Sequence, residues 1–167
     1  MIVLIPLGGT GERFRACGYS KPKALINALG KPVLYWLLDT ISKGESKIDY
    51  VYIPYNMEYE KYNLESQILK DYPNLKFKFL QLKEQTRGAA ETIQIALNDI
   101  PEQNLNKKIL CLDSDNFYSE DIVSIWAARS CANSVVVFQD NSMDSIYSYV
   151  SAGDDYKILD IVEKEKI

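Results

Sequence analysis

The chain opens with the stretch Met1-Ile2-Val3-Leu4-Ile5-Pro6-Leu7-Gly8-Gly9-Thr10-Gly11-Glu12-Arg13. Residues 2–7 are a continuous apolar run that ends in glycine, which is typical of a strand buried on both faces of a sheet. The run is too short for the apolar part of a signal peptide, and it lacks a basic flank and a cleavage site. It therefore predicts a central strand of a parallel sheet, followed by a glycine-rich loop.

Strands and helices alternate after this opening. The apolar spacing predicts helices at residues 32–41, 57–72 and 89–100, and a helix that Ser119 caps and that extends through Trp126. It predicts strands at residues 51–53, 75–79, 109–112 and 135–138, and a hairpin of strands 146–150 and 158–162 joined by Gly153-Asp154-Asp155. This alternation predicts one three-layer α/β domain over residues 1–167, with a mainly parallel sheet that becomes mixed near its end.

Composition excludes several classes of protein. The 167 residues include 19 Lys+Arg, 23 Asp+Glu and no His, for a formal net charge of −4. Without His, neither a Ser-His-Asp triad nor a Cys-His pair can form, and a metal site would rest on carboxylates or on the three cysteines. The acidic balance argues against nucleic acid as a partner. No apolar run approaches the length of about 18 residues that a membrane-spanning helix needs.

The three cysteines, Cys17, Cys111 and Cys131, are widely spaced. They form no Cys-x-x-Cys pair, so the sequence predicts neither a disulfide framework nor a zinc ribbon. This cysteine usage fits a reducing compartment, and we expect a cytoplasmic protein.

The glycine-rich loop is a candidate phosphate-binding loop. Gly8, Gly9 and Gly11 would let backbone N–H groups approach phosphates, and Arg13 could hold a phosphate with two hydrogen bonds. The spacing is not that of a P-loop, and Phe14 stands where a dinucleotide-binding fingerprint would place its third glycine. A flexible connection between strand and helix is the alternative.

Two further motifs give this loop a context. Lys21-Pro22-Lys23-Ala24-Leu25 and Leu29-Gly30-Lys31-Pro32 follow it. The combination resembles the signature of the sugar-1-phosphate nucleotidyltransferases, which are the pyrophosphorylase-type NTP transferases. The resemblance implies the Rossmann-like, GT-A-like fold of the nucleotide-diphospho-sugar transferases. It extends over the whole chain, but it covers only the N-terminal portion of the family's catalytic domain, so we expect the chain to be truncated at its C-terminal end.

Carried over by position, the resemblance implies nucleotide-binding roles for Leu7, Gly8, Gly9 and Gly11. It implies catalytic roles for Arg13 and Lys23, with Lys21 as a weaker candidate. A positive charge over the α-phosphate stabilises the charge that grows there as pyrophosphate leaves. Without the motif, these lysines would be interpreted as solvated loop charges.

The segment Thr86-Arg87-Gly88-Ala89-Ala90 opens a predicted helix where similar enzymes place a Gly-Thr-Ala-like turn against the nucleotide base. Gly88 is the best match, and Gln85 could offer an amide to the base edge. Arg87 departs from the family pattern, and it could contact a phosphate or cap the loop. The alternative for Gly88 is a glycine at a helix start.

Asp113-Ser114-Asp115-Asn116 follows the strand predicted at residues 109–112, at the sheet edge where open α/β sheets bind ligands. Asp115-Asn116 resembles the Gly-Asp-Asn turn of the thymidylyltransferases, whose Asp holds Mg²⁺, with Ser114 replacing the glycine. We therefore expect Mg²⁺ at Asp115 and, second, at Asp113. An Asx turn is the alternative.

Glu163-Lys164 follows the last predicted strand and resembles the Glu-Lys-Pro of the family, with Glu165 in place of the proline. The resemblance implies that Glu163 binds the acceptor and that Lys164 is catalytic through the acceptor phosphate. A solvated charged tail, residues 163–167, is the alternative. The family's second metal-binding Asp has no counterpart before residue 167.

These observations predict a Mg²⁺-dependent nucleotidyltransferase that transfers an NMP from an NTP to a phosphorylated small molecule and releases pyrophosphate. The resemblance allows a cytidylyl-, thymidylyl- or uridylyltransferase, for instance in polysaccharide biosynthesis. The alternatives are a GT-A-type glycosyltransferase that uses Asp113 and Asp115, and a non-catalytic nucleotide-binding fragment. The twelve tyrosines could build a homo-oligomer interface, or they could pack in the core.

Overall fold

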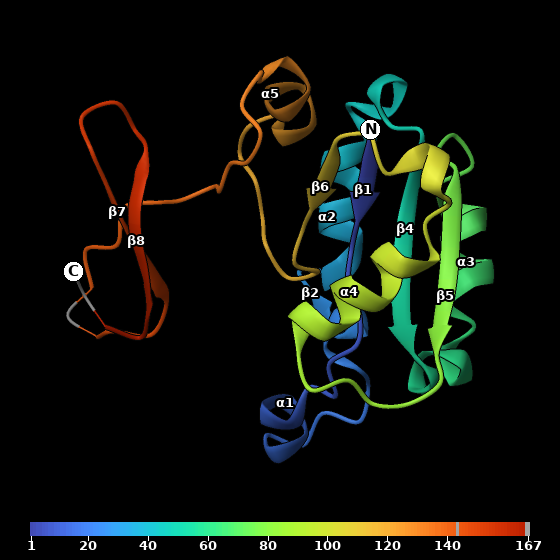
Figure 1. Ribbon diagram of the computed structural model, residues 1–167. Helices are drawn as coiled ribbons and strands as arrows, with labels where there is room; N and C mark the ends of the chain where they lie inside the picture. The colour runs from blue at the N-terminus through green and yellow to red at the C-terminus, as the bar shows by residue number, and fades with distance from the viewer. Residues whose placement is uncertain (143, 166–167) are drawn as a thin grey trace. The chain divides into compact units, whose positions relative to one another are not determined.

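The computed structural model describes residues 1–142 and 144–165 and divides into two compact units, Met1–Arg129 and Ser130–Ile167. Figure 1 traces the chain through both units. The end of the predicted charged tail, Lys166 and Ile167, lies outside the described residues. Each unit is described by itself, so the single domain expected over residues 1–167 stays a prediction.

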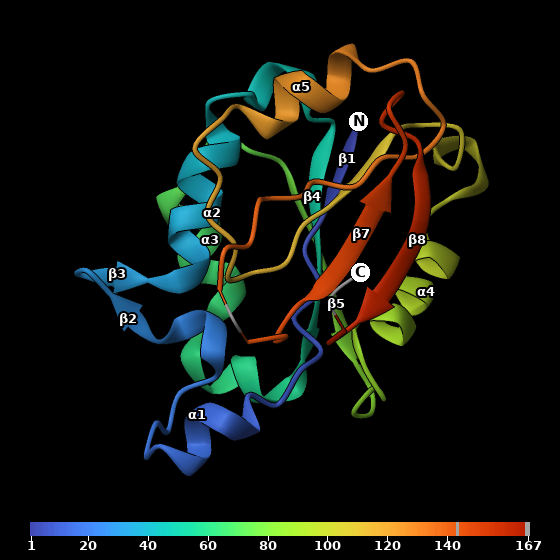
Figure 2. The ribbon, with the colours of Figure 1, turned by 90° about the vertical axis from the view of Figure 1, so that its left-hand side faces the viewer.

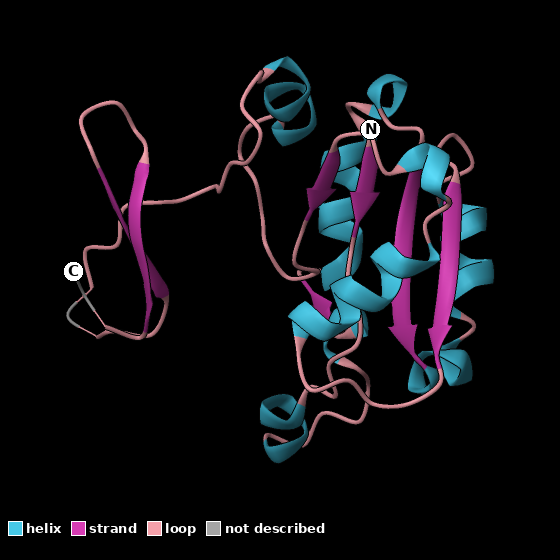
Figure 3. Cartoon of the chain, in the orientation of Figure 1, coloured by secondary structure: helices cyan, strands magenta, loops and turns pink. Residues whose placement is uncertain are grey.

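A parallel four-stranded sheet forms the centre of the first unit. Its strands lie in the order β5 (Phe77–Leu82), β4 (Tyr50–Asn56), β1 (Ile2–Leu4) and β6 (Ile109–Cys111), and every neighbouring pair is parallel. Residues 2–5 are fully buried, as the apolar run predicted. The chain builds the sheet from β1 outward to β4 and β5 and then returns to the other side of β1 with β6 (Figure 3).

Helices cover both faces of this sheet. The α-helices are α1 (Glu12–Ala16), α2 (Val33–Ser42), α3 (Leu64–Asp71), α4 (Ala89–Asp99) and α5 (Ile122–Ala128), and the 3₁₀ helices are η1 (Lys23–Leu25), η2 (Glu45–Lys47), η3 (Met57–Tyr62) and η4 (Glu102–Asn104). Figure 1 shows α4 on one face of the sheet and α2 and α3 on the other. None of the helices in the described part combines the length and the hydropathy of a membrane span.

The two faces of the sheet have separate cores, because successive side chains of a strand point to opposite faces. Ile2, Leu4 and Tyr52 pack with Ala96 of α4. Val3, Ile5, Val51 and Ile53 belong to the larger core, which also holds the buried side chains of α2 and α3: Leu34, Leu37, Leu38, Ile41, Leu64 and Ile68. The three layers confirm the predicted architecture.

Two short antiparallel hairpins lie outside the parallel sheet. β2 (Asn27–Ala28) pairs with β3 (Lys31–Pro32) in the first unit. β7 (Ser148–Ala152) pairs with β8 (Ile158–Glu163) in the second unit, close to the predicted hairpin (Figure 2). Antiparallel pairing is therefore confined, in the described residues, to these two-stranded sheets.

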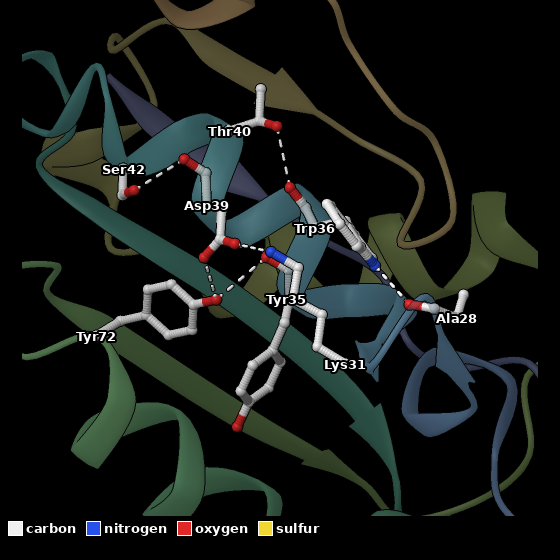
Figure 4. Close-up of polar contacts among 8 residues, drawn as sticks. All are labelled: Ala28, Lys31, Tyr35, Trp36, Asp39, Thr40, Ser42 and Tyr72. Carbon is white, nitrogen blue, oxygen red and sulfur yellow. Dashed lines mark hydrogen bonds and ion pairs between the residues drawn. The ribbon is translucent and has the colours of Figure 1, made fainter.

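The first hairpin is fixed to α2 by polar contacts that Figure 4 shows. Lys31 forms an ion pair with Asp39 of α2 and lies 3.8 Å from the ring centroid of Trp36. The indole N–H of Trp36 donates to the carbonyl of Ala28 at 2.9 Å, and the Tyr72 hydroxyl donates to Asp39 at 2.7 Å. Lys31 of the Gly-Lys-Pro motif thus joins β3 to α2.

Three local predictions are wrong. The helix expected at 57–72 is divided into η3 and α3 by Asn63, which has a φ of 50° and so cannot continue a helix. Asp121, not Ser119, caps α5, and its carboxylate accepts the N–H of Ser124 at 3.0 Å. Residues 135–138 form no strand and are 47–68% exposed, so this apolar run is not buried in a sheet as the sequence pattern predicted.

Candidate active site

The loops that follow β1 and β6 leave the same edge of the sheet, because these strands are parallel neighbours. The strand order reverses between β1 and β6, since the chain first moves outward through β4 and β5. Ligands of open α/β sheets bind at such a switch point, beyond the carboxyl ends of the strands. The glycine loop, residues 8–11, and the acidic loop, residues 113–116, flank this position.

The glycine loop is anchored where it begins. The N–H of Leu7 donates to the carbonyl of Pro54 at 2.8 Å, and the carbonyl of Leu7 accepts the N–H of Asn56 at 3.0 Å. Leu7 is buried, and both its N–H and its carbonyl are hydrogen-bonded to residues of β4. Leu7 therefore fixes the start of the loop that the sequence assigned to the nucleotide.

Gly8 packs against the start of α4. A Cβ atom at Gly8 would overlap the hydroxyl of Thr92 and would lie 2.8 Å from that of Thr86. These two hydroxyls are hydrogen-bonded to each other at 2.7 Å, and the Thr92 hydroxyl donates to the carbonyl of Gly88 at 3.2 Å. Glycine is thus required here for the loop to approach α4 closely, a reason that the motif alone does not reveal.

The other end of the loop is held by α1 and η3. Gly11 has a φ of +67°, and its carbonyl accepts the N–H groups of Phe14 and Arg15 at 3.0 and 3.1 Å. The guanidinium of Arg15 donates to the carbonyl of Thr10 at 3.0 Å and forms an ion pair with Glu58 of η3. Sequence reasoning did not single out Arg15 or Glu58, since only the folded chain brings residues 15 and 58 together.

Lys23 joins the glycine loop to the acidic loop. It begins η1, and a Cβ atom at Gly11 would lie 3.4 Å from the Cβ atom of Lys23. Its ammonium group forms an ion pair with the carboxylate of Asp115 and lies 5.8 Å from the ring centroid of Phe14. The structure therefore brings together Gly11, Lys23 and Asp115, which the sequence selected from three separate segments.

Asp113 adds a second carboxylate beside Asp115. Desolvation of its carboxyl by surrounding atoms, and then the negative charge of Asp115, raise the pKa of Asp113, while the Lys23 ammonium opposes this shift. Two carboxylates that repel each other in this way favour a bound cation. Among the described residues there is no group of three or more His, Cys, Asp or Glu side chains that could hold a metal.

The remaining predicted residues of the first unit lie at its surface. Arg13 in α1 and Gln85 before α4 are exposed, and neither side chain forms a hydrogen bond or ion pair with a described residue. Gly88 precedes α4 in an extended conformation. Arg87 bonds to Glu91, its N–H to one carboxylate oxygen at 2.6 Å and its Nε to the other at 3.0 Å, which is the capping alternative considered for it.

Glu163 and Lys164 lie in the second unit. Glu163 ends β8, and Lys164 follows it with a φ of 57° and donates its N–H to the carbonyl of Tyr147 at 2.7 Å. Their side chains form an ion pair at 3.3 Å and are 73% and 59% exposed, respectively. Both residues are described within their own unit.

Comparison with known families decides the class of protein. The profile of the family described as "Nucleotidyl transferase" matches residues 2–166, which is nearly the whole chain. The chain belongs to the nucleotidyl transferase family. This membership confirms the resemblance that the motifs carried.

Relatives of this nucleotidyl transferase chain are distant. The chain is 26% identical over 167 residues to the "Bifunctional protein GlmU" of Methanococcus maripaludis strain C7, matching 99% of the chain. It spans only 36% of the length of that relative.

Solved structures share the fold of this nucleotidyl transferase chain. They include a nucleoside-diphosphate-sugar pyrophosphorylase from Vibrio cholerae (19% identity, TM-score 0.71, 100% of this chain and 68% of the other). They also include a putative glucose-1-phosphate thymidylyltransferase from Bacillus anthracis (15% identity, TM-score 0.74) and the inositol-1-phosphate CTP transferase from T. maritima (14% identity, TM-score 0.71). Each of these two matches covers 99% of this chain and 65% of the other chain. At these identities the likeness establishes the fold, which is that of the nucleotide-diphospho-sugar transferases, as predicted.

Proposed function

We propose that the chain transfers an NMP from an NTP to a phosphorylated small molecule, with release of pyrophosphate. The observation that supports this most strongly is the Lys23–Asp115 ion pair at the switch point between β1 and β6. Lys23 lies beside Gly11 of the glycine loop and contacts Asp115, so a group that could bind phosphate is next to a group that could bind a cation. Membership of the nucleotidyl transferase family favours this reaction over a glycosyltransferase.

The reaction suits a site without histidine. The attacking group is the acceptor phosphate, which is already an anion and needs no strong general base. Catalysis can then rest on in-line positioning and on charge stabilisation around the α-phosphate. Backbone N–H groups of Gly9 and Gly11 would hold the triphosphate, and Lys23 and Arg13 would stabilise the charge as pyrophosphate leaves.

Mg²⁺ fits the donor set of the acidic loop. One or two carboxylates and the phosphates of the substrate are the usual ligands of Mg²⁺ in such sites. Asp115 would be its main ligand and Asp113 the second, and the cation would offset the desolvation and the negative charge of Asp115 that raise the pKa of Asp113. Bound Mg²⁺ supplies neutralisation of phosphate charge.

The proposal also covers the residues that would bind the nucleotide base and the acceptor. Gln85 and Gly88, at the start of α4, would face the base, while Glu163 and Lys164 would bind the acceptor and its phosphate. Similar structures are described as a thymidylyltransferase and as CTP transferases for inositol 1-phosphate and phosphocholine. We accordingly propose a pyrimidine nucleotide as donor and a phosphorylated metabolite as acceptor, in a cytoplasmic setting that three free cysteines suit.

Calorimetric titration of the chain with CTP, UTP, dTTP, ATP and GTP, with and without Mg²⁺, tests the proposal. We expect one pyrimidine nucleotide to bind selectively in the presence of Mg²⁺. Binding should be lost in Lys23→Ala and Asp115→Asn and retained in Lys70→Ala, which removes an exposed lysine of α3. Equal binding by Lys23→Ala would contradict the site, and hydrolysis of a UDP-sugar without pyrophosphate chemistry would favour the glycosyltransferase.

A further inference from the structure

A second polar pocket lies beside the segment that carries Lys23. It has a volume of about 280 Å³ and is lined by residues of η1 and the loop before it, of β3, and of the segment from η3 to α3. The hydroxyl of Tyr62 donates to the carbonyl of Ser20 at 3.3 Å and so brings these segments together. The pocket includes none of the glycine or acidic loop residues proposed above.

Four polar side chains line the pocket and lack protein partners. Lys21, Lys61, Asn63 and Gln67 form no side-chain hydrogen bond or ion pair with any described residue, and no described carboxylate lines the pocket. These exposed side chains together offer two ammonium groups and two amides as donors to an anion that accepts several hydrogen bonds.

Three carboxylates of η3 and α3 have partners other than the two pocket lysines. In η3, Glu58 pairs with Arg15. In α3, Glu65 accepts the Tyr55 hydroxyl at 2.6 Å, and Asp71, at the end of the helix, accepts the Tyr35 hydroxyl at 3.0 Å. None of these three carboxylates forms an ion pair with Lys21 or Lys61.

We propose that this pocket binds the phosphate group of a small phosphorylated molecule, at a site separate from the proposed NTP site. Lys21 and Lys61 match the charge of a phosphate dianion, and the amides of Asn63 and Gln67 donate to its oxygens. Leu25 and Pro32 offer an apolar wall for a small organic part. The ammonium of Lys23, two residues beyond Lys21, is paired with Asp115 instead, so the segment presents one lysine to each site.

Amide NMR titration with inorganic phosphate tests the proposal, with ionic strength held constant by NaCl because exposed charges respond to screening. Glycerol 3-phosphate and Mg²⁺-free CTP as further titrants distinguish a small phosphate ester from a nucleotide. We expect saturable shifts at residues 20–25 and 61–67, with inorganic phosphate and with glycerol 3-phosphate. Lys21→Ala and Lys61→Ala should each weaken binding about fivefold, the upper range for exposed ion pairs.

The controls separate this site from the proposed function. Lys70→Ala removes the same charge from α3 outside the pocket, and Lys23→Ala disables the proposed NTP site; neither should change the phosphate titration. The proposal is overturned if the shifts do not saturate, if they occur only at residues 8–13, or if CTP alone produces them. It is also overturned if Lys61→Glu, which reverses the charge, binds phosphate as the unaltered chain does.

Discussion

Gly8 of the loop after β1 lies so close to the Thr92 hydroxyl of α4 that no side chain fits between them. We predict that Gly8→Ala destabilises the chain by about 1–3 kcal/mol, the usual cost of an extra methyl group in a tightly packed site. Urea unfolding at equilibrium measures this change. Because the overlap involves Thr92, the double variant Gly8→Ala/Thr92→Ala should lose less stability than the two single variants added together.

Gly9 provides the matched control for Gly8. Apart from its chain neighbours, no described atom lies within 4 Å of the position that a Cβ atom at Gly9 would take, and its φ is outside the left-handed range. Gly9→Ala should therefore leave the free energy of unfolding within about 0.5 kcal/mol of the unaltered chain, as surface substitutions usually do. Equal destabilisation by both substitutions would show that loop flexibility, and not the contact with α4, requires glycine.

A second prediction concerns the Arg15–Glu58 pair, which holds Thr10 of the glycine loop. Arg15 and Glu58 are partly exposed, so Arg15→Ala should cost only about 1 kcal/mol of stability. The loop must then be ordered by the nucleotide, so we expect the KM for the NTP to rise about five- to tenfold while kcat changes less.

The cycle of Arg15→Ala, Glu58→Ala and the double variant measures how these two residues act together. If they act as one clamp, the double variant should be no worse than Arg15→Ala alone. Arg13→Ala should instead lower kcat, since Arg13 is proposed to contact the reacting phosphates. Equal effects of Arg15→Ala on kcat and KM would contradict a purely positioning role.

The sequence predicts the sheet and its covering helices well because these depend on local patterns. The apolar run at 2–7, the proline at the start of α2 and the period of its buried residues are all visible in the chain. The break at Asn63 and the cap at Asp121 are less visible, since Asn in a positive φ and Asp at a cap compete with equally acceptable neighbours.

The candidate site divides in the same way. Gly11, Lys23 and Asp115 were selected from motifs, and their meeting depends on β6 pairing with β1, which sequence periodicity cannot specify. Gly8 and Thr92 are 84 residues apart in the sequence, and Arg15 and Glu58 are 43 residues apart. Neither Thr92 nor Glu58 belongs to a recognisable motif. Long-range packing, not local propensity, determines these contacts.

A third prediction concerns acid stability through Asp39. Burial alone would raise the pKa of Asp39, but the hydrogen bonds from Lys31 and Tyr72 outweigh it and hold the pKa below its ordinary value. A lowered pKa stabilises the fold above the pKa of the unfolded chain, about 3.9, and this contribution is lost as the pH falls through the lowered value. Asp39→Asn should therefore cost about 1 kcal/mol at pH 7 and progressively less below about pH 4.

Urea unfolding between pH 3 and pH 7 measures the Asp39 effect. Glu84→Gln is the control, because Glu84 is exposed and has no hydrogen bond or ion pair within the described residues. A stability difference between Asp39→Asn and the unaltered chain that stays constant over this range would show that packing, and not the charge of Asp39, stabilises the β3–α2 contact.

The last prediction concerns Lys108, which precedes β6 and holds the end of α5. Its ammonium donates to the carbonyls of Trp126 at 3.1 Å and Ala127 at 2.9 Å, and also to that of Arg129. A positive charge at a helix C-terminus satisfies carbonyls that the helix leaves free and is favoured by the helix dipole.

Lys108→Met should therefore cost about 1–2 kcal/mol of stability, although it keeps most of the apolar stem. Urea unfolding measures the loss of stability. In hydrogen exchange, the amides of α5 should show a larger increase in exchange rate than those of any other described helix. Lys70→Met, which removes an exposed lysine without such contacts, should change neither; if both variants behave alike, the carbonyl contacts of Lys108 do not stabilise α5.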